Sequence, residues 1–187
     1  MKPCLFALAA IAIAAPAYAA PAPSWVIEKA ASKIGFTSSM SGESFSGSFR
    51  KWDAAIRFDP KNLAGSSVTT TIDMTSAVTG DEDRDESLPS AQWFFTTKHP
   101  QATYAATKFK ALGGNRYQAD GTLTMRGVAK PLSLPFTLTI TGDTAKMTSA
   151  IDLNRLAFGV GSGEWASTTA VPANVRVDIV LVDKRAK

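Results

Sequence analysis

The stretch YAATKFKALGGNRYQADGTLTM, residues 104–125, decides the fold class. Apolar residues alternate with polar ones on both sides of its centre, which is the spacing of strands that bury one face. Gly113-Gly114-Asn115 separates the two halves, and a short glycine-rich connection is typical of a β-hairpin. Because so short a connection requires antiparallel neighbours, the sequence predicts an antiparallel pair here.

The same period of two continues through most of the chain. It covers residues 34–40 and 68–74, and Gly142-Asp143 marks a second hairpin. About nine strand candidates follow one another at the spacing typical of a sandwich or a barrel. Pro135 lies inside one candidate and lacks a backbone donor, so we expect a bulge or a locally unpaired stretch there.

One segment, Asp81–Leu88, is predicted to be a short helix. Its acidic residues favour the positive end of a helix dipole, and Pro89 prevents its continuation. The three aromatic residues of 93–95 follow, and they cannot all face one side. At least one should enter the core, and another is expected to line a cavity or its mouth. The sequence thus predicts an all-β protein with one or two short helical segments around residues 81–95.

Residues 1–19 have the pattern of a secretory signal peptide. Lys2 supplies a positive charge, an apolar run follows, and small residues stand at the third and first positions before a cut after Ala19. The apolar run is too short to span a bilayer. Cleavage would leave one domain, residues 20–187, without the single cysteine of the chain. We therefore expect an exported protein with no disulfide and no thiolate metal site.

The distribution of charge argues against a nucleic-acid partner. The formal net charge is +4, but no run of lysine and arginine exceeds two residues. Asp81–Glu86 contains five acidic residues and one arginine, so the remaining surface is more basic than the net charge indicates. Such a surface would attract anionic lipid head groups weakly, and we expect only transient contact with a membrane surface or a membrane protein.

Motifs for catalysis and for metal binding are weak. His99 is the only histidine, and no Gly-x-Ser-x-Gly motif accompanies it. The acidic segment fails as a calcium loop because Glu86 and Gln92 replace the required glycine and glutamate. Gly159–Gly163 lacks the third glycine of a dinucleotide-binding loop. A pair of carboxylates brought together by two strands stays open, but nothing in the sequence singles one out. We predict a protein that is not an enzyme and has no metal site.

Aromatic residues provide the positive signal. Seven phenylalanines mostly occupy the apolar phase of their strands and should converge on one interior. They are Phe36, Phe45, Phe49, Phe58, Phe109, Phe136 and Phe158. Two interpretations are open at this point: an ordinary packed core, or a barrel lumen that holds an apolar ligand.

Three segments between residues 84 and 161 form a family signature. RDESLPSAQWF, residues 84–94, is similar to an R-D-x-H-L-x-S-x-x-F-F stretch, and GTLTMRGVAKPL, residues 121–132, is similar to G-x-L-T-x-H-G-V-x-K-P-V. LNRLAFGVG, residues 153–161, is similar to N-R-x-x-F-G. In these segments, and in their order and spacing, the chain resembles the YceI-like family of periplasmic polyisoprenoid-binding proteins.

The resemblance implies an antiparallel, eight-stranded, lipocalin-like barrel whose lumen holds a long polyisoprenoid of the prenyl quinone or prenyl pyrophosphate type. The implied role is transport, storage or sequestration of that lipid, with no cofactor apart from it. The alternatives are a periplasmic subunit that delivers quinone to a membrane electron-transfer partner and an isoprenoid-modifying enzyme. The expected tail-binding residues are Phe36, Phe45, Phe49, Phe58, Trp93, Phe94, Phe109, Leu123, Met125, Phe136 and Phe158.

The head-group site implied by the resemblance is less complete. Its candidates are Arg84, Asp85, Lys130 and Arg155. Ser87 and Arg126 stand where many members of the family have histidine, and Phe95 stands where an acid is common. The apolar pattern is intact, so tail binding is the more direct implication.

Overall fold

The computed structural model describes residues 20–186, and the predicted signal peptide lies outside the described residues. This part of the chain contains eleven strands, one α-helix and five 3-10 helices. The strands are β1 (Ser24–Ile27), β2 (Lys33–Met40), β3 (Glu43–Phe49), β4 (Trp52–Arg57), β5 (Ser67–Asp73), β6 (Ala77–Val78), β7 (Gln101–Gly113), β8 (Arg116–Met125), β9 (Val128–Thr141), β10 (Thr144–Asn154) and β11 (Asn174–Arg185). The helices are α1 (Glu82–Ser87), η1 (Lys29–Ala31), η2 (Leu63–Gly65), η3 (Met74–Ser76), η4 (Arg155–Phe158) and η5 (Gly163–Ala166).

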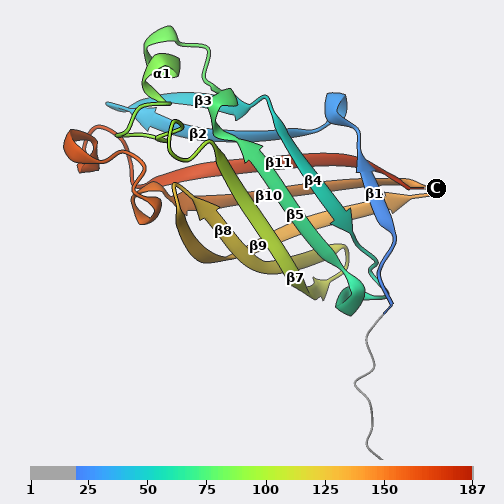
Figure 1. The fold of residues 1–187 in the computed structure, drawn as a ribbon. Coiled ribbons are helices and arrows are strands. Elements are labelled where there is room, and N and C mark those ends of the chain that lie inside the picture. Colours follow the sequence, from blue (N-terminus) through green and yellow to red (C-terminus); the bar gives the residue numbers. More distant parts are fainter. Residues whose placement is uncertain (1–19, 187) are drawn as a thin grey trace, which may run out of the picture.

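Three pairs of strands act as single interrupted strands, which reduces the eleven described strands to an eight-stranded barrel. β1 and β2 both pair with β11, on either side of η1. In the same way β4 and β3 pair with β1 and β2, and β5 and β6 pair with β4 and β3. Each later strand pairs antiparallel with the next, and β11 returns to β1 and β2 (Figure 1). The predicted all-β, antiparallel, eight-stranded barrel is therefore confirmed.

The predicted hairpin of residues 104–125 forms as β7 and β8. Tyr104 lies directly opposite Leu123, and both side chains are buried. Gly113 and Gly114 adopt φ values of 96° and 59° at the turn, a conformation that glycine reaches without a steric penalty. The alternation seen in the sequence thus places one side chain in two on the inner face of the barrel.

β9 and β10 pair over only part of their length. Their ladder joins residues 137–141 to residues 144–148 and stops beside Pro135, which has no backbone N–H. The Ser149 hydroxyl donates to the Pro135 carbonyl at 2.7 Å and bridges the two strands where the ladder ends. The unpaired stretch expected at Pro135 is confirmed on the side of β10, whereas on its other side Pro135 lies opposite Gln118 of β8.

The single α-helix lies where the sequence predicts it. The carboxylate of Asp81 caps α1 by accepting a hydrogen bond from the backbone N–H of Arg84 at 3.0 Å. Beyond Leu88 the chain continues in turns, and a second helix does not form before Phe95. No helix within residues 20–186 combines the length and the apolar character that a membrane span requires.

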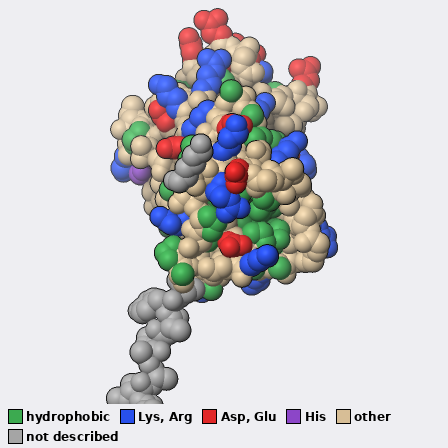
Figure 2. Space-filling view, turned by 90° about the vertical axis from the view of Figure 1, so that its right-hand side faces the viewer, with side chains coloured by type: hydrophobic (Ala, Val, Ile, Leu, Met, Phe, Trp, Pro, Cys, Tyr) green, Lys and Arg blue, Asp and Glu red, His purple; other side chains and the backbone are tan. Residues whose placement is uncertain are grey.

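The two ends of the barrel differ. The end that we call the lid end carries two long connections, residues 79–100 with α1 and residues 155–173. The opposite end, which we call the base, carries the tight β7–β8 and β9–β10 turns and the C-terminus of β11 (Figure 1). Figure 2 looks onto the base, where Lys and Arg side chains alternate with Asp and Glu beside hydrophobic ones. The two longest connections of the barrel therefore both lie at the lid end.

Candidate functional site

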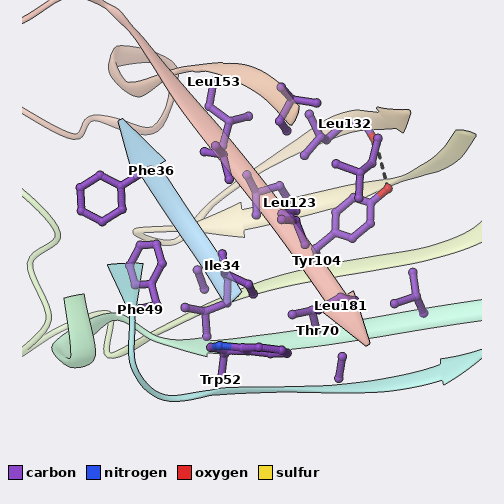
Figure 3. A pocket seen from close by; sticks show the side chains of 18 of the residues that line it. Ile34, Phe36, Phe49, Trp52, Thr70, Tyr104, Leu123, Leu132, Leu153 and Leu181 are labelled. Atoms are coloured by element: carbon purple, nitrogen blue, oxygen red, sulfur yellow. Dashed lines mark hydrogen bonds between the residues drawn. The ribbon is translucent and has the colours of Figure 1, made fainter. Parts of the chain in front are cut away.

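An apolar cavity runs through the barrel between the lid end and the base. It encloses about 240 Å³, more than the roughly 150 Å³ at which an apolar cavity in a protein core holds benzene. Inward-facing residues of all eight barrel strands form its wall. Figure 3 shows Ile34 and Phe36 of β2, Leu123 of β8, Leu153 of β10 and Leu181 of β11 lining this space. The lumen is thus large enough to admit a small apolar molecule.

Ten of the eleven side chains predicted to bind a lipid tail line this cavity. They are Phe36, Phe45, Phe49, Phe58, Trp93, Phe94, Phe109, Leu123, Met125 and Phe136. Phe158 is buried in the same apolar cluster but is not part of the wall. It belongs to η4 and not to a strand, so the alternation that directs the others inward does not apply to it.

Much of the wall was not predicted because it is aliphatic. β10 contributes Met147, Ile151 and Leu153, and β11 contributes every second residue from Val175 to Asp183. The alternation within Asn174–Arg185 is the sequence signal that could have identified the β11 residues. Trp25 and Trp52 also line the cavity and were not predicted.

Tyr104 brings a polar group to the middle of the wall, and that group is satisfied. Its hydroxyl lies 2.9 Å from the carbonyl oxygen of Ala119. It also lies 3.3 Å from the carbonyl oxygen of Leu132 (Figure 3). Burial raises the pKa of Tyr104 to about 12, so the phenol is neutral at physiological pH. The Tyr104 hydroxyl is therefore bonded to the wall itself, and the middle of the lumen presents a mainly apolar surface.

The lid end of the cavity is covered by residues 88–96, which we call the strap. Leu88, Trp93 and Phe94 line the cavity from the strap. Phe95 adopts a positive φ of 52°, and its ring lies against His99 with the ring centroids 5.9 Å apart. The expectation that these aromatic residues divide between the cavity and other positions is confirmed.

Two other segments hold the strap in place. The backbone N–H groups of Gly161 and Ser162 both donate to the Gln92 carbonyl at 2.8 Å. The Arg126 guanidinium donates to the carbonyls of residues 91–93. Arg126, which occupies a family histidine position, therefore binds the backbone of the strap.

Arg155 forms part of the cavity wall at the lid end and is only 3% exposed. A guanidinium has five N–H donors, and here they reach six backbone carbonyls. The acceptors are those of Val160, Gly161, Trp165, Ser167, Val171 and Pro172. A Cβ at position 161 would lie 2.0 Å from the Arg155 Nη1 atom, so glycine is required there. Arg155, a head-group candidate, thus has no donor left for a ligand in this arrangement.

The other three head-group candidates do not line the cavity. The Asp85 carboxylate accepts hydrogen bonds from residues 79–80 and fixes the turn before α1. The Arg84 guanidinium lies over the ring of Phe45, 4.8 Å from its centroid, and Phe45 does line the cavity. Lys130 is exposed on β9, opposite Leu123 of β8. Of these three, Arg84 is the one placed against the wall.

The acidic segment Asp81–Glu86 is used by the fold. Asp81 caps α1, and Asp85 holds the preceding turn. Within residues 20–186, no three side chains of His, Cys, Asp or Glu gather into a group that could hold a metal ion. The carboxylates of Asp81 and Asp85 therefore stabilise the local backbone conformation through hydrogen bonds.

Asp183 brings a carboxyl group to the base of the cavity. It faces inward from β11, beside Ile27 of β1 and Ala145 of β10, and it is 4% exposed. Its Oδ1 atom is buried and has no hydrogen-bond partner. Burial, together with the negative charge of Glu28, raises the pKa of Asp183 to about 6. The base thus carries a buried carboxyl group for whose Oδ1 atom the described residues provide no hydrogen-bond donor.

Curated proteins resemble this chain over part of their length. The UPF0312 protein PC1_2518 of Pectobacterium carotovorum subsp. carotovorum is 42% identical over 97 residues, and Protein YceI of Shigella flexneri is 41% identical over 97 residues. Each match covers 52% of this chain and 50% of the relative. The chain spans about half the length of the curated relatives it matches.

Solved structures and the family profile cover more of the chain. BcnA of Burkholderia cenocepacia aligns with a TM-score of 0.81 and 33% identity over 83% of this chain and 98% of that chain. A polyisoprenoid binding domain from Saccharophagus degradans aligns with a TM-score of 0.69 over 89% of this chain and 99% of that one; at 16% identity this likeness supports the fold alone. The profile of the YceI-like domain matches residues 25–182. The chain belongs to the YceI-like family.

Proposed function

We propose that this protein binds a long polyisoprenoid lipid with its tail in the barrel lumen, and that it transports, stores or sequesters the lipid in the periplasm. The observation that carries the proposal is the cavity, whose wall comes from apolar side chains of all eight barrel strands. The solved Saccharophagus degradans domain of the same fold is described as polyisoprenoid binding. The predicted signal peptide supports the periplasmic location.

The length of the lumen suits an extended chain. Along β11 the wall extends from Val175 to Asp183, about 26 Å at roughly 3.3 Å per residue. Burial of one CH₂ group stabilises a complex by about 0.8 kcal/mol, so a five-carbon isoprene unit contributes roughly 3–4 kcal/mol before entropy is subtracted. The depth of the lumen, more than contacts with a head group, should therefore select the chain length.

The test places a charge on the wall. Leu123→Glu should carry far less lipid than the wild-type protein, because an unpaired charge in the apolar lumen is strongly disfavoured and blocks the space. Phe45→Glu should also carry less lipid, because it removes an apolar ring from the wall and places there a polar group that can pair with the neighbouring Arg84 guanidinium. The lipid is extracted from natively exported protein and quantified by mass spectrometry. Thr122→Glu is the matched control, because residue 122 is exposed and adjacent to Leu123 on β8.

Circular dichroism must show that each variant retains the barrel. Leu123 is 7% exposed, whereas Phe45 is only half-buried, so Phe45→Glu tests the lumen even if Leu123→Glu does not fold. The proposal fails if the wild-type protein carries no lipid and accepts none from prenyl quinone or prenyl pyrophosphate. It also fails if both lumen variants retain as much lipid as Thr122→Glu.

A further inference from the structure

Two buried side-chain oxygen atoms within residues 20–186 lack a hydrogen-bond partner. They are the Oγ atom of Ser38 and the Oδ1 atom of Asp183, and both residues line the cavity. Buried polar atoms are almost always paired in folded proteins, so an unpaired one needs an explanation. That both line one apolar cavity points to the occupant of that cavity.

The two residues lie at opposite ends of the lumen. Ser38 follows Thr37, which pairs with Arg176, so it lies level with the start of β11, whereas Asp183 is near the end of that strand. This separation is about 26 Å at roughly 3.3 Å per residue. Ser38 is therefore at the lid end, and Asp183 alone marks the base.

The two cationic residues that follow Asp183 in β11 pair with other carboxylates. The Lys184 Nζ atom pairs with Glu28 Oε1 at 2.8 Å, and the Arg185 Nε atom lies 3.5 Å from Asp143 Oδ1. The residues opposite Asp183 on both neighbouring strands, Ile27 and Ala145, have apolar side chains. A buried carboxylate without a partner destabilises the fold, whereas an aliphatic residue would continue the pattern of β11.

We propose that Asp183 contacts the ligand and accepts a hydrogen bond from a hydroxyl group at the end of a lipid that reaches the base of the lumen. The inference rests on the proposed function and specifies its ligand class: a long isoprenoid alcohol is preferred over an isoprenoid of the same length without a donor. An ionised carboxylate has acceptors only, so an ether leaves it desolvated and unpaired. A phosphate at that position would be repelled by the like charge.

The probes are geranylgeraniol and its methyl ether. They share one tail, and the ether has a methyl group in place of the hydroxyl hydrogen of the alcohol. Binding to delipidated protein at pH 8 is followed by intrinsic fluorescence, because Trp25, Trp52 and Trp93 line the cavity. We expect the wild-type protein to bind the alcohol about tenfold more tightly than the ether. Asp183→Leu should reduce this ratio to about one, as expected when the acceptor is removed.

Two further variants separate the hydrogen bond from other effects. Asp183→Asn keeps an acceptor oxygen and should retain part of the preference, and it also serves if the leucine variant does not fold. Asp178→Leu is the matched control on β11; its carboxylate pairs with Arg176 outside the lumen, and the wild-type ratio should persist.

The outcomes distinguish this inference from the proposed function. Equal wild-type affinity for the two probes, or a ratio that Asp183→Leu leaves unchanged, overturns the role of Asp183 while lipid binding stands. If the wild-type protein binds neither probe nor any prenyl quinone or prenyl pyrophosphate, lipid binding itself is wrong and the inference falls with it.

Discussion

The lid end and the base each bury one charged side chain at the cavity. The side chain at the lid end is fully hydrogen-bonded, whereas the one at the base has an oxygen atom without a partner. Arg155 at the lid end is 3% exposed and Asp183 at the base is 4% exposed, so depth does not separate them. All donors of Arg155 reach backbone carbonyls, whereas Asp183 Oδ1 reaches nothing. A buried charge with its bonds complete holds structure together, and one without them weakens the fold.

The difference follows from how each end is built. Residues 155–173 form irregular backbone over the lid end, and their carbonyls lack the partners that a strand ladder supplies. Arg155 provides those donors. Asp183 instead lies in the β11 ladder, whose backbone groups already pair with β1 and β10. The hydrogen bonds of the folded chain therefore account for Arg155 but not for Asp183, for which we propose a contact with the ligand.

Removal of the Arg155 side chain should cause the largest loss of stability. Arg155→Met leaves buried carbonyls of residues 160–172 without donors and should lower the free energy of unfolding by about 3–5 kcal/mol. Urea unfolding at pH 7, followed by circular dichroism, measures this loss. Arg155→Lys keeps three donors, so its free energy of unfolding should lie between those of the wild-type protein and Arg155→Met. Arg176→Met, on the exposed face of β11, is the control. A loss under about 1 kcal/mol would contradict the structural role.

Replacement of Asp183, in contrast, should stabilise the lipid-free protein. Because burial raises its pKa to about 6, the folded protein binds more protons than the unfolded chain between about pH 4 and pH 6, and stability falls as the pH rises through that window. Asp183→Leu removes this penalty and should stabilise lipid-free protein by about 2 kcal/mol at pH 8. The gain should shrink toward pH 4. Thermal unfolding over this pH range tests it, and a gain that does not depend on pH would rule out the buried carboxylate as its cause.

Tyr104 provides a reference between the two ends, a buried polar group that is neutral and paired. Tyr104→Phe keeps the ring and removes the hydroxyl from the carbonyls of Ala119 and Leu132. We expect a loss of about 1 kcal/mol in unfolding free energy. The loss should be constant between pH 5 and pH 9, since the pKa of about 12 lies above that range. A pH-dependent loss would show that the phenol titrates within it.

Removal of the Ser38 hydroxyl should have the smallest effect on stability. Its Oγ atom has no partner to lose, so Ser38→Ala should change the unfolding free energy of lipid-free protein by less than about 0.5 kcal/mol. Urea unfolding beside Tyr104→Phe measures both under one condition. A loss as large as that of Tyr104→Phe would mean that the hydroxyl is bonded in solution.

The barrel and most of its lining could be predicted from sequence because alternation directs them. Phe36 and Leu123 face the lumen for the same reason, the period of two on a strand. Phe158 looked the same in sequence, but it belongs to a 3-10 helix where that period has no meaning. The head-group candidates were chosen by similarity of motif, and motif similarity carries no information on which donors are free. Arg155 is the example, because its acceptors lie up to seventeen residues away along the chain.

The amino-acid sequence by itself determined the all-β class, the antiparallel pairing, the position of α1 and the apolar face, because these depend on neighbours a few residues apart. Local patterns indicate about nine strand candidates, and the number eight came from the family resemblance. The structure shows its physical basis, since β1 with β2, β3 with β4 and β5 with β6 become single strands only through their shared partners. Tertiary structure alone decided the state of the two buried charges. Whether Arg155 and Asp183 have hydrogen-bond partners depends on groups that closure of the barrel brings together. These groups are far apart in the chain, so a local sequence pattern does not reveal that they meet.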